Sequence, residues 1–205
     1  DSTGNLVVDV SSQCVKATLG GGYNLLQGEF QAAMATFRIV DPNGDWNPAN
    51  PASPYYGYLT VNRKIRFTAN YSGTGYFLFS GYITAYNYSY PKNQDIGYVD
   101  LVCTDAFRLM ALAGITTVSG TSAGQTTGQR INSILDQVNF PSTMRNIEAG
   151  STTVQADPST LRTALAAIQN CEFSEQGAFY IDGQGNATFK NRQFLQQASA
   201  KTPTY

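Results

Sequence analysis

One long extended run constrains the fold of this chain more than any other feature. The run GYFLFSGYITAYNYSY, residues 75–90, is the longest strand-like segment of the sequence, because aromatic and β-branched residues favour strands. Gly81 lies inside the run and indicates a bulge or a bend, as found at the corners of barrels. Side chains that alternate along a strand share a face, so one face is expected to carry a stripe of mainly tyrosine side chains: Tyr82, Thr84, Tyr86, Tyr88 and Tyr90.

Other segments of the first half have the same alternating character. Strands are predicted within residues 5–22, 31–41, 64–71 and 98–104, and a short amphipathic helix at 105–112. Residues 1–112 are therefore expected to form an antiparallel β-barrel or sandwich, with a barrel favoured, capped by this helix. The tyrosine stripe suits a sugar-binding platform, a subunit interface, where tyrosine is enriched, or the half-buried face of a strand.

The pattern changes after a Thr/Ser/Gly-rich connector. Apolar residues at helical spacing predict a helix at 129–138. A second helix is expected to begin with Asp157 as its N-cap and Pro158 in its first turn. Residues 177–192 predict a hairpin around a Gly-rich turn. Residues 113–192 thus form a small α+β domain in a mainly-β, α+β protein, and residues 193–205 are a polar tail or the start of a missing second barrel.

Composition excludes several kinds of chemistry. The chain has no histidine, which excludes His-activated nucleophiles and zinc sites that need histidine. Cys14, Cys103 and Cys171 are far apart, so they are interpreted as buried small hydrophobic residues. Glu172 and Glu175 are interpreted as solvated carboxylates at a turn. We therefore expect no enzyme activity, no cofactor and no metal.

Charge and hydropathy limit the partners in the same way. Only 13% of the residues are charged and the net charge is -1, so no basic patch for neutralising nucleic-acid phosphates is expected. No apolar run approaches the roughly 20 residues that span a bilayer. The sequence predicts neither specific nucleic-acid binding nor a membrane span.

The loop DPNGDWNPANPASPYYG, residues 41–57, begins like many calcium loops. An EF-hand needs Gly at its sixth position and Glu at its twelfth, where this chain has Trp46 and Ala52. A structural loop held by Asx-turns is favoured, although a calcium loop of another type stays open. The candidate loop residues are Asp41, Asn43, Asp45, Trp46, Pro48, Asn50, Pro54, Tyr55 and Tyr56.

This loop and its flanking strands, residues 35–67, resemble the characteristic stretch of minor tail proteins from long-tailed bacteriophages. Further segments resemble that family in the same order, so the resemblance covers residues 7–192: LFSGYITAYNYSYP, VDLVCTDAFRLMA, GQRINSILDQVNFP and SEQGAFYIDGQGNATFKNR. Trp46 stands where the family often has Phe, and Gly44-Asp45 replaces the usual Gly-Arg.

The resemblance implies a virion protein of the phage tail tip, assembled in the host cytoplasm and acting in host attachment and genome ejection. Such baseplate hubs combine tail-tube-like barrels with an inserted α+β domain in a ring that continues the tube. The implied partners are further copies of the chain, as a trimer or a hexamer, and the distal tail, tape-measure and receptor-binding proteins. Trp46, Tyr55 and Tyr56 are then expected at or beside a subunit contact. The alternative is a carbohydrate-binding module or a tail-associated glycan-degrading domain.

Overall fold

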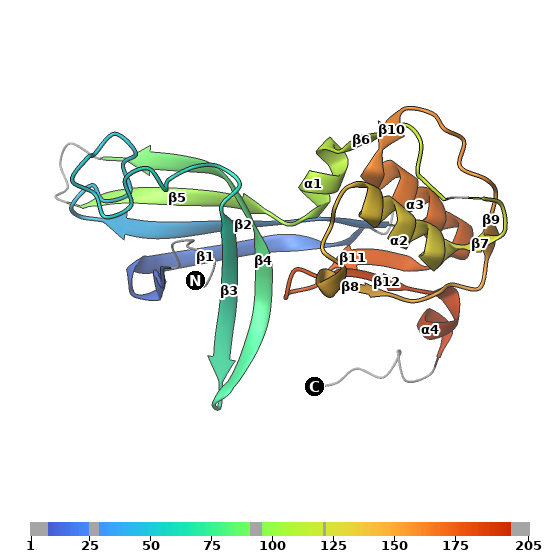
Figure 1. Ribbon diagram of the computed structural model, residues 1–205. Coiled ribbons are helices and arrows are strands. Elements are labelled where there is room, and N and C mark those ends of the chain that lie inside the picture. Colours follow the sequence, from blue (N-terminus) through green and yellow to red (C-terminus); the bar gives the residue numbers. More distant parts are fainter. Residues whose placement is uncertain (1–7, 25–28, 91–95, 121, 198–205) are drawn as a thin grey trace. The chain divides into compact units, whose positions relative to one another are not determined.

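The structure is a computed structural model in which residues 8–24, 29–90, 96–120 and 122–197 are described (Figure 1). It divides into two compact units. Unit 1 comprises Asp1–Gly20 and Ala33–Thr104, and unit 2 comprises Gly21–Ala32 and Asp105–Tyr205. The sequence placed the boundary after the helix at 105–112, whereas this division places that helix in unit 2. Residues 198–205 of the expected polar tail lie outside the described residues.

Most of unit 1 is one five-stranded sheet in the order β1-β2-β5-β4-β3, of which only the parts of β1 and β2 within Gly21–Ala32 belong to unit 2. Its strands are β1 (Cys14–Asn24), β2 (Glu29–Asp41), β3 (Lys64–Tyr71), β4 (Thr74–Ser89) and β5 (Gly97–Thr104), preceded by the 3-10 turn η1 (Ser11–Gln13). Strands predicted from the alternating pattern are confirmed at all five places. β1 and β3 are the edges, so the described strands leave the sheet open, and closure into a barrel stays a prediction.

The core of unit 1 is built from the central strands β2 and β5. Their register pairs Phe37 with Leu101 and Ile39 with Val99, and these four side chains are at most 3% exposed. Directly opposite residues in an antiparallel pair point to the same face of the sheet. Full burial of each such side chain contributes about 1.5–3 kcal/mol to folding, so the period-two pattern fixes which face of the sheet is covered.

The prediction that one face of β4 carries a stripe of mainly tyrosine side chains is wrong. The register against β5 shifts at Thr84, because Ile83 pairs with Cys103 while Ala85 pairs with Val102. One extra residue in a strand reverses the alternation that follows it. Tyr82 therefore lies on the opposite face from Tyr86 and Tyr88, which follow the bulge.

Gly81 is not the bulged residue in the pairing of β4 with β5, and the bend that was the alternative stays a prediction. A Cβ atom at Gly81 would lie 2.4 Å from the Thr104 carbonyl oxygen and 2.6 Å from the Phe79 ring. Only a residue without a side chain lets these strands approach so closely. The extra residue is Thr84, whose Oγ1 donates a hydrogen bond of 3.0 Å to the Val102 carbonyl.

Unit 2 packs helices and short strands around its own core. Its α-helices are α1 (Phe107–Leu112), α2 (Thr127–Gln137), α3 (Ala164–Glu175) and α4 (Arg192–Gln196), with a 3-10 turn η2 (Ser142–Met144). Its strands are β6 (Gly114–Ile115), β7 (Gln125–Thr126), β8 (Arg145–Ile147), β9 (Thr153–Val154), β10 (Arg162–Thr163), β11 (Ala178–Ile181) and β12 (Ala187–Lys190). The mainly-β, α+β class is confirmed.

The first predicted helix and the hairpin of unit 2 are confirmed. α2 begins with a capping box, in which Thr126 and Gln129 exchange hydrogen bonds with each other's backbone N–H. β11 and β12 form the antiparallel hairpin. β8 then pairs in parallel with β12, which the sequence did not indicate.

The predicted start of the second helix is wrong. α3 begins at Ala164 and is capped by Thr163, whose side chain accepts from the Ala166 N–H. The Asp157 carboxylate instead accepts both hydrogen bonds from the Arg162 Nη2, at 2.6 and 2.9 Å. It is thus engaged in a salt bridge ahead of the helix, and Leu161, which a helix starting at Asp157 would include, is 78% exposed.

Candidate functional site

The loop after β2 is a chain of short turns, as expected from its Asn and Pro content. Backbone hydrogen bonds three residues apart link Asn47 to Gly44, Asn50 to Asn47, and Ser53 to Asn50. The side chains of Asn47 and Asn50 accept from the backbone N–H two residues further on, at 2.9 and 3.1 Å. These are Asx-turns, so the prediction that the loop satisfies its own backbone is confirmed.

Asp41 anchors the base of this loop from within unit 1. It is 2% exposed, and its Oδ2 accepts from the Trp46 backbone N–H at 3.3 Å and the Tyr90 hydroxyl at 3.1 Å. Burial, and then the hydrogen bond to Asp41, raise the pKa of Tyr90 to about 12. Tyr90 therefore stays a neutral donor, and the contact fastens the end of β4 to the loop.

Trp46 belongs to the hydrophobic core rather than to an exposed surface. Its side chain is 7% exposed within the cluster that contains Phe37 and Ile39. The rings of Trp46 and Tyr55 have centroids 5.2 Å apart, and the Trp46 Nε1 donates to the Gln13 Oε1 at 3.3 Å. Truncation of Trp46 would therefore act on folding before it acted on any subunit contact.

The remaining loop candidates divide by exposure. Asp45, Asn50 and Tyr55 are half-buried, while the exposed ones are Asn43, Pro48, Pro54 and Tyr56. Tyr56, 53% exposed, is the large side chain of the loop that remains available to a partner. Among the described residues, no three His, Cys, Asp or Glu side chains are placed where they could share a metal ion.

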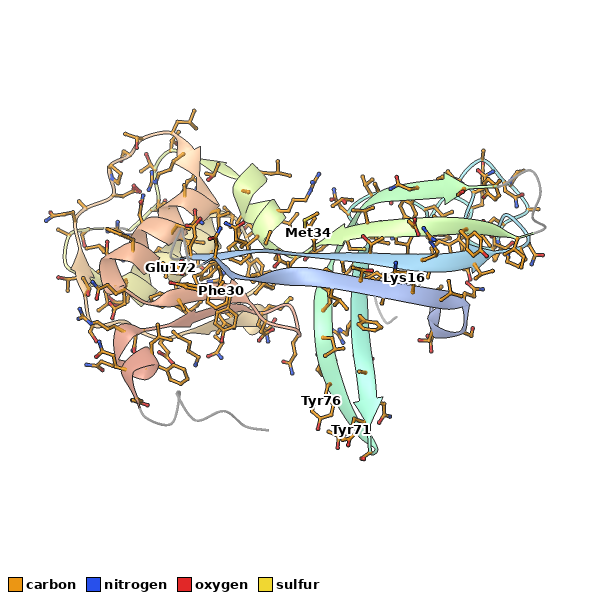
Figure 2. The ribbon with its side chains drawn as sticks, turned by 180° about the vertical axis from the view of Figure 1, so that it is seen from behind. Lys16, Phe30, Met34, Tyr71, Tyr76 and Glu172 are labelled. Atoms are coloured by element: carbon orange, nitrogen blue, oxygen red, sulfur yellow. The ribbon has the colours of Figure 1, made fainter. Side chains whose placement is uncertain are left out.

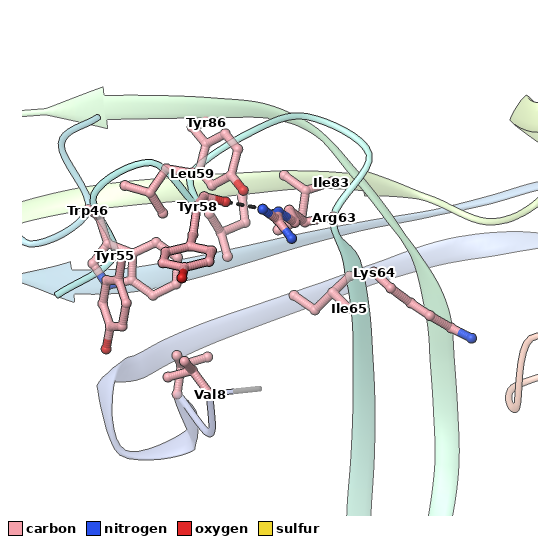
Figure 3. Close-up of a pocket in the computed structure, with 12 residues that line it drawn as sticks. Val8, Trp46, Tyr55, Tyr58, Leu59, Arg63, Lys64, Ile65, Ile83 and Tyr86 are labelled. Atoms are coloured by element: carbon pink, nitrogen blue, oxygen red, sulfur yellow. Dashed lines mark hydrogen bonds between the residues drawn. The ribbon is translucent and has the colours of Figure 1, made fainter. Parts of the chain in front are cut away.

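A small cavity of about 140 Å³ lies beside this loop (Figure 3). Trp46, Tyr55 and Tyr86 contribute aromatic rings to its lining, and Arg63 and Lys64 contribute positive charge. The Tyr86 hydroxyl donates to the Thr60 carbonyl at 3.1 Å. Burial, and to a lesser extent the neighbouring Tyr88, raise the pKa of Tyr86 to about 12, so Tyr86 presents a neutral hydroxyl at neutral pH.

The two glutamates of α3 are not solvated, and the interpretation from the sequence was wrong. Glu172 is 5% exposed and Glu175 is completely buried. The Glu172 carboxylate accepts from the Phe179 N–H at 2.9 Å, and burial raises its pKa to about 7. Both carboxylates hold backbone of unit 2 in place. Their spacing of three residues near a helix end was the only sequence signal, and it does not reveal burial.

The interpretation of the cysteines as buried small hydrophobic residues holds for two of the three. Cys103 and Cys171 are free and buried, and Cys14 is free and half-buried. Burial raises the pKa of Cys103 to about 12 and that of Cys171 to about 11, so both thiols are protonated and unreactive at neutral pH. No helix among the described residues combines the length and apolar character that crossing a membrane requires.

Comparison with known proteins gives a structural likeness only. No protein-family model matches the chain, and no curated protein matches its sequence. The structure is similar to the tail protein from Neisseria meningitidis MC58, with a TM-score of 0.53 and 12% sequence identity over 84% of this chain and 45% of that one.

A second similar structure is the 43 kDa tail protein of prophage MuSo2 from Shewanella oneidensis. Its TM-score is 0.47 at 12% identity, over 85% of this chain and 54% of that one. The chain thus spans about half the length of these two proteins. The likeness to the Neisseria protein shows that the two share a fold.

Proposed function

We propose that this chain is a structural protein of a bacteriophage tail, without catalytic activity. The observation that carries the proposal is the fold shared with the Neisseria meningitidis tail protein across 84% of the chain. The order of tail-like sequence segments from residue 7 to residue 192 supports the same assignment.

Within the tail, the proposed position is the tip, where the chain acts as a baseplate hub or minor tail protein. Copies of the chain form a trimeric or hexameric ring that continues the tube and includes a closed barrel. The ring links to the distal tail, tape-measure and receptor-binding proteins after assembly in the host cytoplasm. Its low charge suits a channel through which DNA passes, because few basic residues would hold phosphates.

The first test is the mass of the purified chain in solution, measured by light scattering over a concentration series. A trimer or a hexamer is expected. Tyr56→Ala should weaken that assembly while leaving the fold intact, because Tyr56 is 53% exposed. Phe173→Ala is the matched control, since Phe173 is an 87% exposed aromatic residue of unit 2. A monomer at every concentration contradicts assembly by this chain alone.

The cavity beside the loop is the observation that favours the alternative of carbohydrate binding. Its lining by Trp46, Tyr55 and Tyr86 offers aromatic surface of the kind that sugar rings stack on. A glycan array and a peptidoglycan-digestion assay separate the two functions. The structural role predicts no signal in either assay, whereas a specific glycan signal would favour the binding module.

A further inference from the structure

A large cavity lies between the two edge strands of unit 1. Its volume is about 1060 Å³, and it is lined by residues 14–17 of β1 and by residues 62–68 in and before β3. This volume lies at the upper end of the roughly 300–1,000 Å³ of typical small-molecule pockets. The lining along β3 is continuous over several residues, which suits an extended polypeptide better than a compact ligand.

The apolar part of the lining has the spacing of a strand-binding surface. Phe37 and Ile39 of β2 are 3% and 0% exposed and line the cavity, together with Ile65 and Phe67 of β3. Members of each pair are two residues apart, so they point to the same face of their strand. An added strand with apolar side chains at every second position would place them against Ile65 and Phe67, which are half-buried, over a floor formed by the already covered Phe37 and Ile39.

Positively charged side chains outnumber acidic ones in the lining of the cavity. Lys16, Arg63 and Arg66 line it, together with Lys64, which already has an interaction partner, against a single acidic residue, Asp9. Arg63 and Lys64 also line the smaller cavity beside the loop, which Figure 3 shows. Complementary charge steers association and selects partners, so this lining favours a strand that carries carboxylates.

The edge of β3 supplies the backbone for such a strand. β3 pairs with β4 along one side, and no other described strand pairs with it. An open edge is a template for pairing with another chain, and addition of a peptide to such an edge is a recurrent mode of recognition. Lys16, labelled on β1 in Figure 2, is a lining residue of the cavity outside β3.

We propose that unit 1 binds an extended segment of a different protein, which adds as a strand beside β3 and alternates apolar with acidic side chains. No described strand of a second copy of this chain fits that description. Among its described strands of unit 1 and unit 2, acidic side chains occur only as Glu29, Asp41 and Asp100. Asp41 is buried and Asp100 is paired with Arg38 at 2.8 Å. The inference rests on the cavity and does not require the tail function.

The test screens a display library of random dodecapeptides for peptides that bind the immobilised chain. The selected peptides should alternate apolar residues with Asp or Glu, and their binding should slow amide hydrogen exchange in residues 64–71. In the variant Lys16→Glu/Arg66→Glu, their Kd should rise about tenfold or more. Arg108→Glu, a charge reversal at an exposed site of unit 2, should leave the Kd unchanged.

Several results overturn the proposal. A library that yields no enriched peptide, or peptides without acidic residues at alternate positions, excludes the proposed partner. Equal loss of binding in the Arg108→Glu control also excludes it, as does protection confined to unit 2. A dimer of the chain alone that protects residues 64–71 identifies a second copy as the occupant and likewise overturns it. As a control for folding, amide hydrogen exchange in β5 of the double variant should equal that of the wild type, which shows that unit 1 is still folded.

Discussion

Glu175 offers the sharpest test of how unit 2 is held together. Its carboxylate is completely buried at the end of α3. It accepts hydrogen bonds from the Thr127 hydroxyl at 3.0 Å and the Thr152 N–H at 2.7 Å, and the Ser151 N–H reaches both oxygens at 3.1 and 3.0 Å. The side chain therefore joins α3 to the start of α2 and to the loop before β9.

The cost of a substitution can be worked out from these contacts. Glu175→Gln keeps the shape but removes the charge and directs an NH₂ donor toward the Ser151 N–H. Because hydrogen bonds to charged groups contribute about 1.5–3 kcal/mol, we expect a loss of about 2–3 kcal/mol of unfolding free energy. Glu175→Ala leaves two backbone N–H groups and a hydroxyl without their acceptor, at about 1–3 kcal/mol for each unsatisfied group.

Urea unfolding with two probes measures this loss in the right unit. The four α-helices of the described residues lie in unit 2, so far-ultraviolet circular dichroism near the helix minimum mainly follows that unit. The single tryptophan, Trp46, lies in unit 1, so its fluorescence follows unit 1. With an m-value of about 2 kcal/mol/M, Glu175→Gln should lower the helix midpoint by roughly 1 M urea.

The pH dependence gives a second, independent measure. Burial acts to raise the pKa of Glu175, but the hydrogen bonds from Thr152, Ser151 and Thr127 outweigh it and lower the pKa. A lowered folded-state pKa stabilises the protein above the unfolded value of about 4.3, and this stability is lost as the pH falls through the folded value. Glu175→Gln should remove that acid-side loss. A helix midpoint equal to that of the wild type at neutral pH would refute this account.

Four substitutions have definite expected effects on stability. Burial raises the pKa of Glu172 to about 7 in the folded protein, above its unfolded value of about 4.3, so the stability of the wild type should fall as the pH rises from about 4.3 to 7. Glu172→Gln should abolish this fall. Urea midpoints measured across this pH range test it. Trp46→Ala should cost about 3–5 kcal/mol in unit 1, measured by hydrogen exchange in β2 and β5, whereas Tyr56→Ala should change stability by less than about 0.5 kcal/mol. Gly128→Ala should destabilise unit 2 by several degrees in Tm, since its Cβ would lie 1.9 Å from the Glu148 carbonyl oxygen; a Tm equal to that of the wild type contradicts the close packing.

The sequence predicted what depends on local alternation. The five strands of unit 1 and helix α2 were recognisable because each buries a face at its own period. The Asx-turns of the loop were recognisable because Asn47 and Asn50 bond to backbone only two residues away.

What the sequence could not predict depends on residues far apart in the chain. The bulge at Thr84 follows from its pairing with β5, and nothing in the local run places it there. Glu175 looks like a surface carboxylate until Ser151 and Thr152 are brought to it. For the same reason, the cavity between β1 and β3 leaves no mark in either strand. Asp157 is a different case: it resembled a helix cap because Pro158 follows it, but it pairs with Arg162 only five residues later, and α3 begins after that pair, at Ala164.

The β1–β2 hairpin has a consequence for synthesis of the chain. Its end, Gly21–Ala32, belongs to unit 2, where the Phe30 ring lies 5.0 Å from that of Tyr180 and 5.3 Å from that of Tyr23. At about 5–20 residues per second, the ribosome makes Tyr180 roughly 8–30 s after Phe30. During that interval unit 1 can be completed, since its residues end at Thr104, but unit 2 cannot. The nascent chain therefore presents Tyr23 and Phe30 to chaperones, or to neighbouring nascent chains, until the rest of unit 2 has been made.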